Sequence, residues 1–182
     1  LDRTIITFTD ITPLAEERRI LRIRAATDAL TGIANRAELA EALDRECNRT
    51  SRHADNLCAI MFDIDHFKVV NDTYGHPAGD VVLTTLTHLV SRHVRDHDTF
   101  GRYGGEEFLL ITPQTGVDEA RQLAERLRSE IENHSFPAIG QVTCSFGVTA
   151  NRPDDTPDTL IARADTALYD AKEAGRNCVV VR

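Results

Sequence analysis

Continuous apolar runs and alternating residues mark the strands that the sequence predicts. The run LCAIMF (57–62) is wholly apolar, which is typical of a short strand buried on both faces of a sheet. The segments 98–103 and 107–112 flank Gly104 and Gly105, and this pattern predicts a hairpin. The predicted strands after the first one are DTFGRY (98–103), EFLLIT (107–112), QVTCSFGVTA (141–150) and NCVVVR (177–182).

Between the strands, apolar residues recur at helical spacing. Asn35 is suited to cap a helix that runs to about His53, in which Leu39, Ala42 and Leu43 share one face. A short helix within HFKVVNDTYG (66–75) ends at a glycine, the residue type most suited to a C-cap. The other predicted helices cover 78–94, 118–133 and 158–175.

The order of these elements predicts the fold class. A strand, helices, a hairpin, a helix and a strand form the split βαβ plan of an α+β protein, with helices on a central antiparallel sheet of about five strands. In that plan the strand 57–62 and the first hairpin strand run parallel, with the second hairpin strand between them. The strand 57–62 therefore ends at the same edge as the hairpin turn. We expect Asp63, Asp65 and Glu106 to meet there.

The first 27 residues follow a different pattern. RTIITFTDIT predicts a strand that ends at residue 12, and residues 13–27 are charged and helix-prone, which suits a linker helix. We place the domain boundary near Thr27 and Asp28, so that 28–182 form one domain of ordinary size. The chain begins with Leu rather than Met, and we expect it to be a fragment of a longer protein.

Composition narrows the class of protein. Of the 182 residues, 41% are hydrophobic, which is enough for a sizeable core. The formal net charge of −8 argues against a broad grip on nucleic acid, but it leaves room for a small basic pocket that binds an anionic molecule. No apolar run approaches the roughly 20 residues that span a bilayer, and no signal peptide is visible.

The four cysteines are scattered and lack CxxC spacing, which indicates reduced, buried thiols and a cytoplasmic protein. Membrane tethering of the full-length protein stays open.

Two acidic segments carry the candidate chemistry. FDID (62–65) follows the apolar strand, and RYGGEEF (102–108) occupies the hairpin turn. Converging carboxylates repel one another unless a cation lies between them, and Mg²⁺ is typically held by one or two carboxylates plus substrate phosphates. For an isolated acid at a strand end, a solvated loop residue is the better interpretation. Two acidic segments at one edge favour the cation site.

These motifs resemble a known family. FDIDHFKVVNDTYGHPAGD (62–80), RYGGEEF, DALTGIANR (28–36) and ADTALYDAKEAGRN (164–177) are similar to motifs of the GGDEF family of diguanylate cyclases, here in a GGEEF form. The resemblance covers about 28–182. It implies a fold related to polymerase palms and class III nucleotide cyclases, and the condensation of two GTP molecules into cyclic di-GMP. Ile33 and Ala37 depart from the usual family residues without touching the motifs assigned to catalysis.

The resemblance implies that Asp63, the backbone carbonyl of Ile64 and Glu106 bind Mg²⁺, or Mn²⁺ in its place. Glu106 is also the family's candidate for deprotonating the attacking 3′-hydroxyl, although the metal alone can lower that pKa. Glu107 is either a second contact to metal or triphosphate, or an acid that shapes the turn. We favour the second interpretation.

The substrate contacts also come from the resemblance. Asn71 and Asp80 match a pair that reads guanine, and adenine would leave the carboxylate of Asp80 unpaired. His76 lies in the following turn, where a structural role is an equal alternative. The remaining assigned groups are the backbones of Gly104 and Gly105 near the nucleotide, the Phe67 N–H and Lys68 at a phosphate, and Lys172 and Arg176, four residues apart on one helix face, at the triphosphate.

The resemblance further implies a site for inhibition by the product. Arg95 and Asp98 form an RxxD just before the hairpin, and Arg126 supplies a second arginine. Arginine can bind phosphates bidentately or stack on guanine. The other histidines (53, 66, 88, 93, 97 and 134) show no metal spacing and receive no role.

The expected partners follow from the product, which has two equivalent phosphodiester bonds, whereas one domain offers one nucleotide site. We therefore expect a two-fold homodimer. ITFTDIT (6–12) resembles the closing strand of a PAS sensor domain, so we expect an upstream sensor in the same chain. The alternative from another class is a catalytically inactive domain that binds GTP or cyclic di-GMP as an effector. It is the weaker hypothesis because both acids of the turn are kept.

Overall fold

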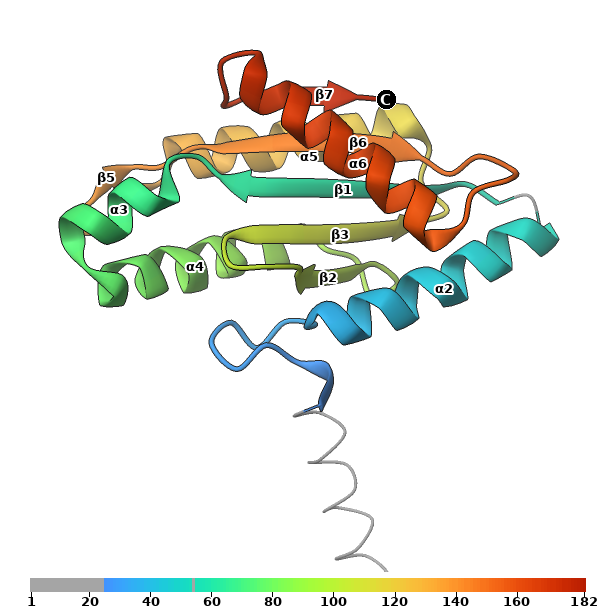
Figure 1. Cartoon of the computed structure of the whole chain (residues 1–182), viewed down its shortest axis with the longest axis horizontal. Helices are drawn as coiled ribbons and strands as arrows, with labels where there is room; N and C mark the ends of the chain where they lie inside the picture. Colours follow the sequence, from blue (N-terminus) through green and yellow to red (C-terminus); the bar gives the residue numbers. More distant parts are fainter. Residues whose placement is uncertain (1–24, 54) are drawn as a thin grey trace, which may run out of the picture.

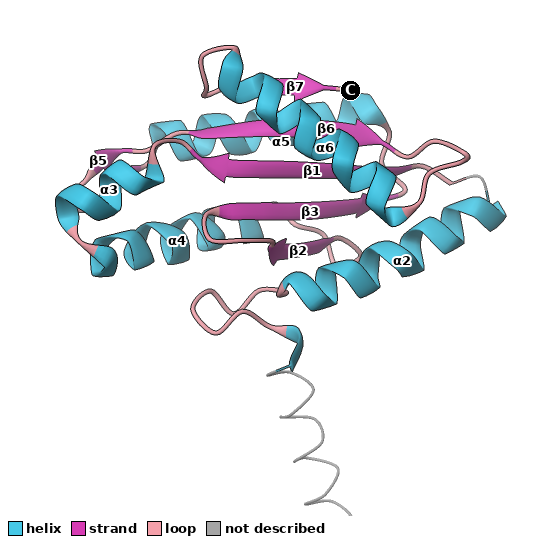
Figure 2. Ribbon diagram, viewed as in Figure 1, coloured by secondary structure: helices cyan, strands magenta, loops and turns pink. Residues whose placement is uncertain are grey.

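The computed structural model describes residues 25–53 and 55–182. A five-stranded sheet forms the centre, with the strand order β2-β3-β1-β6-β7. Helices cover both of its faces (Figures 1 and 2). The strands of this sheet are β1 (Leu57–Ile64), β2 (Thr99–Arg102), β3 (Glu107–Pro113), β6 (Cys144–Ala150) and β7 (Val179–Val181).

The helices pack in two layers. In Figure 1, α2 and α6 lie on the near face of the sheet and α4 and α5 on the far face, while α3 lies at one end. The helices are α2 (Arg36–His53), α3 (Phe67–Tyr74), α4 (His76–Ser91), α5 (Val117–Asn133) and α6 (Pro157–Glu173). The α+β prediction of a five-stranded sheet flanked by helices is confirmed.

Local signals explain where the helices begin and end. The Asn35 side chain accepts hydrogen bonds from the N–H groups of Ala37 and Glu38, so it caps α2 as predicted. Gly75 follows α3 with φ 83°, and its N–H donates to the Asn71 carbonyl. This positive φ favours glycine and ends the short helix where the sequence predicts.

Strand β1 pairs antiparallel with both β3 and β6. Strands β2 and β3 form the predicted hairpin, so β1 and β2 run in the same direction with β3 between them. Strand β7 departs from the antiparallel expectation, because it pairs parallel with β6 after the α6 crossover. A second, two-stranded sheet of β4 (Ser135–Phe136) and β5 (Gly140–Gln141) was not predicted.

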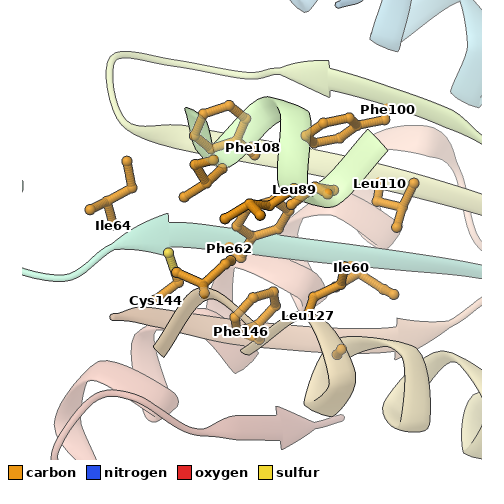
Figure 3. Packing of buried hydrophobic residues seen from close by; sticks show 14 of the residues in the cluster. Ile60, Phe62, Ile64, Leu89, Phe100, Phe108, Leu110, Leu127, Cys144 and Phe146 are labelled. Carbon is orange, nitrogen blue, oxygen red and sulfur yellow. The ribbon is translucent and has the colours of Figure 1, made fainter. Parts of the chain in front are cut away.

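The side chains of β1 alternate between two apolar clusters. Ile60, Phe62 and Ile64 face α4 and α5, whereas Ala59 and Met61 face α2 and α6. On the first face, four aromatic rings from four strands stack in a row (Figure 3). Their ring centroids lie 5.2 Å apart for Phe62–Phe108, 4.8 Å for Phe62–Phe146 and 5.9 Å for Phe100–Phe108.

The predictions for the chain's first segment are not tested. The strand predicted over 1–12 and most of the linker helix predicted over 13–27 lie outside the described residues. Within the described part of the chain, no helix has the length and apolar character needed to cross a membrane.

Helix α6 lies unusually close to β6 at Gly147. A Cβ at this position would come within 3.0 Å of backbone atoms of Ala164, Ala167 and Leu168. The clash is with backbone rather than with a flexible side chain, so relief requires the whole helix to move away from the sheet.

We expect Gly147→Ala to lower the free energy of unfolding by about 3 kcal/mol, because overpacking of a rigid contact costs this order of magnitude. Urea unfolding measures the change. Gly116→Ala is the matched control, because Gly116 has φ −75° and the nearest atom, Asn56 Nδ2, would lie 4.0 Å from the new Cβ. A change of about 1 kcal/mol or less is expected there. Equal effects of the two substitutions would contradict the close approach of α6.

Candidate functional site

The carboxyl end of β1 and the β2–β3 turn meet at one edge of the sheet, as predicted (Figure 1). In the β1–β3 ladder Asp63 lies opposite Glu107, and the Ile64 N–H donates to the Glu106 carbonyl over 3.4 Å. The structure thus brings together Asp63, Ile64, Glu106 and Glu107. The antiparallel register places these acids side by side.

The ammonium group of Lys172 faces the acids. The Lys172 Nζ at the end of α6 lies 3.0 Å from Asp63 Oδ1. Burial raises the pKa of Asp63 to about 6, against the lowering effect of Lys172 and with a further rise from the charges of Glu106 and Glu107. Burial also raises the pKa of Glu106, which Lys172 lowers and Glu107 raises again. The edge therefore holds more negative charge than one ammonium group offsets.

Asp65 does not join this group, so the expectation that it meets Asp63 and Glu106 is wrong. Its carboxylate accepts hydrogen bonds from Thr143 Oγ1 and Ser145 Oγ, each over 2.7 Å, and from the Asn177 N–H over 3.1 Å. These donors occupy both oxygens. Asp65 is buried and serves as an acceptor that ties the end of β1 to β6 and to the segment after α6.

The donor set suits a hard divalent cation. Among the described residues no group of three or more His, Cys, Asp or Glu side chains is placed to hold a metal ion. The predicted ligands are only two carboxylates, Asp63 and Glu106, and the carbonyl of Ile64. Such an incomplete oxygen set, to be completed by water or substrate phosphates, is typical of Mg²⁺ sites.

The hairpin turn has its own supports. Arg102 donates to the Gly105 carbonyl from Nε over 3.0 Å and from Nη2 over 2.6 Å. The same guanidinium lies 3.3 Å from the Asp28 carboxylate. A Cβ on Gly104 would lie 2.7 Å from Glu107 Oε2, so this glycine makes room for the glutamate. This contact fits the interpretation of Glu107 as an acid that shapes the turn.

Helices α3 and α4 bring the predicted guanine-reading pair together. Asn71 lies against Gly79, where a Cβ would come closer than 3.0 Å to its Oδ1. Asp80 is the next residue of α4 and is exposed. His76, also exposed, begins this helix. At the start of α3, Phe67 is buried and Lys68 is exposed.

Arg176 does not share a helix face with Lys172, which corrects that prediction. Helix α6 ends at Glu173, and Arg176 follows it with φ 67°, outside the helix. The four-residue spacing is therefore not a helical spacing here. Gly175 allows the chain to turn because its φ is 112°.

A separate pocket of about 180 Å³ contains all three residues predicted for product inhibition, Arg95, Asp98 and Arg126. The Asp98 side chain is 2% exposed. Its Oδ2 accepts from the Arg95 N–H over 2.9 Å, and its Oδ1 has no hydrogen-bond partner among the described residues. The prediction of one site made by these residues agrees with their common pocket.

Sequence reasoning missed several residues around these sites. His93 received no role, yet it lines the Arg95–Arg126 pocket and contacts Glu130 of α5. Asp28 lies in one of the motifs but was assigned no function, and the structure shows it paired with Arg102 of the hairpin. The Asn177 side chain binds α5, and only its place in the last motif signalled importance.

Comparisons with known proteins agree with this geometry. The family model described as "Diguanylate cyclase, GGDEF domain" matches residues 25–178. Diguanylate cyclase DgcP of Pseudomonas aeruginosa is 43% identical over 159 residues, which cover 86% of this chain and 24% of DgcP. The chain thus spans about a quarter of that relative's length.

Two solved structures are also similar. One is the coiled coil and GGDEF domain of DgcB from Caulobacter crescentus in complex with c-di-GMP, with a TM-score of 0.91 and 31% identity over 95% of this chain and 94% of that one. The other is the active GGEEF domain of a diguanylate cyclase from Vibrio cholerae, with a TM-score of 0.77 and 36% identity over 81% of this chain and 96% of that one.

The raised pKa of Asp63 predicts a stabilising substitution in protein free of divalent cations. Between pH 3.8 and about 6 the unfolded chain has lost a proton that folded Asp63 keeps, so stability falls as the pH rises through this window. The pKa difference corresponds to about 3 kcal/mol at pH 7.5. We expect Asp63→Asn to raise the free energy of unfolding by about 1–3 kcal/mol at pH 7.5 and by much less at pH 4.

Urea unfolding at the two pH values, with a chelator present, measures this effect. Asp72→Asn on α3 is the control, because Asp72 is exposed and its substitution should change stability by less than about 0.5 kcal/mol. A loss of stability in Asp63→Asn at pH 7.5 would show that the ion pair with Lys172 outweighs the cost of burying the charge.

Proposed function

The chain belongs to the GGDEF family of diguanylate cyclases, and from this membership we propose that it condenses two GTP molecules into cyclic di-GMP and two pyrophosphates. The observation that carries the proposal is the edge of the sheet where Asp63, Glu106 and Glu107 gather beside Lys172. The similar Vibrio cholerae domain is described as active and carries a GGEEF turn, which supports activity for the GGEEF form in this chain.

The proposed cofactor is Mg²⁺, with Mn²⁺ as a substitute, held by Asp63, the Ile64 carbonyl and Glu106. Such an ion supplies charge neutralisation at the phosphates and lowers the pKa of a hydroxyl bound near it. The chain contributes the fixed positions of these oxygens, because they lie on a paired strand and a braced turn. Glu106 is also the group proposed to accept the proton of the attacking 3′-hydroxyl.

Guanine specificity is proposed to come from Asn71 and Asp80. The Asp80 carboxylate accepts hydrogen bonds from the N–H groups that guanine presents on its Watson–Crick edge, and the Asn71 amide can both donate and accept. The close approach of α3 and α4 at Gly79 supports this pairing. His76 begins the same helix and stays a candidate contact to the ribose or base.

The phosphates are proposed to bind between the start of α3 and the end of α6. Lys68 and the Phe67 N–H lie at the start of α3, where backbone N–H groups and the helix dipole favour an anion. Lys172 and Arg176 approach from the end of α6. Gly104 and Gly105 leave the backbone of the turn accessible, and a Cβ on Gly105 would meet nothing within 4 Å.

The product requires two nucleotides, so we propose that two copies of the domain face each other with two-fold symmetry. Each 3′-hydroxyl then attacks the α-phosphate of the opposite nucleotide in line, one P–O bond forms, and pyrophosphate leaves with the electron pair of the broken bond. An upstream sensor domain in the same chain would set how often the two halves meet.

Inhibition by the product is proposed to occur at the pocket of Arg95, Asp98 and Arg126. The complex of DgcB with c-di-GMP supports binding of this dinucleotide by a similar domain. The two arginines would bind its phosphates or stack on its guanines. A cytoplasmic location is part of the proposal and is supported by the four free cysteines, three of them buried.

We expect Glu106→Gln to reduce synthesis at least about 100-fold while the protein stays folded, since both a proposed ligand charge and a proton acceptor are lost. The assay is incubation with GTP and Mg²⁺ at several protein concentrations, with detection of pyrophosphate and cyclic di-GMP. Glu41→Gln, an exposed change on α2, is the control. Retained activity in Glu106→Gln would contradict the metal assignment. Lack of turnover in the unmodified chain would favour the effector-binding alternative.

We expect Arg95→Ala to raise about tenfold the cyclic di-GMP concentration that halves the rate, because a charged hydrogen bond to phosphate is worth about 1–3 kcal/mol. The backbone hydrogen bond from residue 95 to Asp98 is kept by alanine. Inhibition curves of both proteins measure the change, with Arg121→Ala, an exposed arginine on the same α5 as Arg126, as the control. An unchanged curve would leave Arg95 as a surface residue.

A further inference from the structure

The last turn of α6 and the segment after it each contact the end of β1. Lys172 Nζ lies 3.0 Å from Asp63 Oδ1, and the Asn177 N–H donates to Asp65 Oδ2 over 3.1 Å. Arg176 lies between these two points and is exposed. Its side chain is thus free to meet a ligand while the backbone on both sides of it is anchored to the strand that carries the acidic edge.

The backbone of this segment has an unusual conformation. Gly175, Arg176 and Asn177 have φ values of 112°, 67° and 47°. Asparagine tolerates the left-handed region better than most residues, whereas arginine has no local compensation for it. Such a conformation persists only where surrounding interactions hold it, and such positions cluster at functional sites. Two sets of interactions hold it here. The Arg176 N–H donates to the Ala171 carbonyl of α6 over 3.1 Å, and Asn177 fixes the residue that follows.

The Asn177 side chain is bound on its far side by α5. Its Oδ1 accepts from Arg128 Nη1 over 3.0 Å, and its Nδ2 donates to Glu132 Oε1 over 2.7 Å. Arg128 is itself held by Glu132 over 2.9 Å and by Glu125 over 2.9 Å. Asp65, on the other side, is fixed by the hydroxyl groups of Ser145 in β6 and of Thr143 just before it. Asn177 therefore joins α5, which its side chain contacts, to the end of β1, which its backbone N–H contacts.

We infer that Asn177 is a positioning residue that holds Arg176 in its left-handed conformation and so presents the guanidinium to the triphosphate of the substrate. The inference rests on the proposed function, in which Arg176 binds that triphosphate. Asn177 itself acts through its neighbour. Its contacts at the guanidinium of Arg128 and the carboxylates of Glu132 and Asp65 set the direction of the backbone from which Arg176 projects.

A purely structural role makes a different prediction. If Asn177 only joined α5 to the last segment, its loss would lower stability without changing the affinity for phosphates. A role through Arg176 requires that removal of Asn177 weaken binding of the triphosphate, and that this loss vanish when Arg176 is already absent.

The test uses the full chain and a GTP analogue with an α,β-methylene bridge, which cannot release pyrophosphate, together with GMP as a ligand that lacks the β- and γ-phosphates. Asn177→Gly removes the side chain but keeps a residue that adopts a positive φ. Binding is measured for this variant, for Arg176→Ala and for the double variant. Asn133→Gly, at the exposed end of α5, is the matched control.

We expect Asn177→Gly to bind the analogue about tenfold more weakly and GMP within about twofold of the unmodified chain. The double variant should bind the analogue as weakly as Arg176→Ala alone, and Asn133→Gly should bind it normally. Unchanged affinity in Asn177→Gly, or losses that add in the double variant, would overturn the inference. If Asn177→Gly does not fold, Asn177→Asp keeps the acceptor for Arg128 and should weaken analogue binding about threefold.

Failure of the proposed function gives a different result. In that case the unmodified chain makes no cyclic di-GMP from GTP. The affinities of the two single variants and the double variant for the analogue still show whether Asn177 acts through Arg176. If the unmodified chain does not bind the analogue at all, Arg176 has no triphosphate to meet, and both the inference and the proposed function are wrong.

Discussion

Burial of carboxylate charge at the end of β1, with repulsion between neighbouring acids added to it, is the constraint on which the site depends. The β1–β3 register places Asp63 opposite Glu107, next to Glu106, in surroundings that exclude much of the water. Electrostatic energies grow as water is removed, so this arrangement is unfavourable unless cations balance it. Lys172 offsets part of the charge. A divalent ion, and the guanidinium of Arg176 in the proposed function, are suited to balance the negative charge that remains.

Local patterns were enough to predict most of the fold. The apolar run at 57–62, the cap at Asn35 and the glycines of the hairpin each specify an element through interactions within a few residues. The two-residue strands β4 and β5 have no such pattern, because one pair of residues carries no periodicity. The parallel pairing of β7 depends on where the α6 crossover delivers the chain, which short-range signals do not encode.

The site was predictable to a smaller extent. Asp63 and Glu106 could be brought together from topology alone, since strand direction determines which ends share an edge. Asp65 was misassigned because its partners Thr143 and Ser145 are distant in the sequence, and ordinary hydroxyl residues give no warning of them. Arg176 was misplaced because a spacing of four suggests a helix face, whereas the helix had already ended. The guanine-reading and product-binding residues came from family resemblance and not from physical pattern.

The alternation along β1 also has an evolutionary consequence. Ile60, Phe62 and Ile64 belong to the stacked core on one face, while Asp63 and Asp65 alternate with them and point to the other. Selection for folding and selection for chemistry therefore act on alternate residues of the same strand, whose side chains contact different neighbours. Asp65 belongs to the scaffold through its hydrogen bonds, whereas replacement of Asp63 leaves the stacked core untouched, so activity and stability can diverge among descendants of one fold.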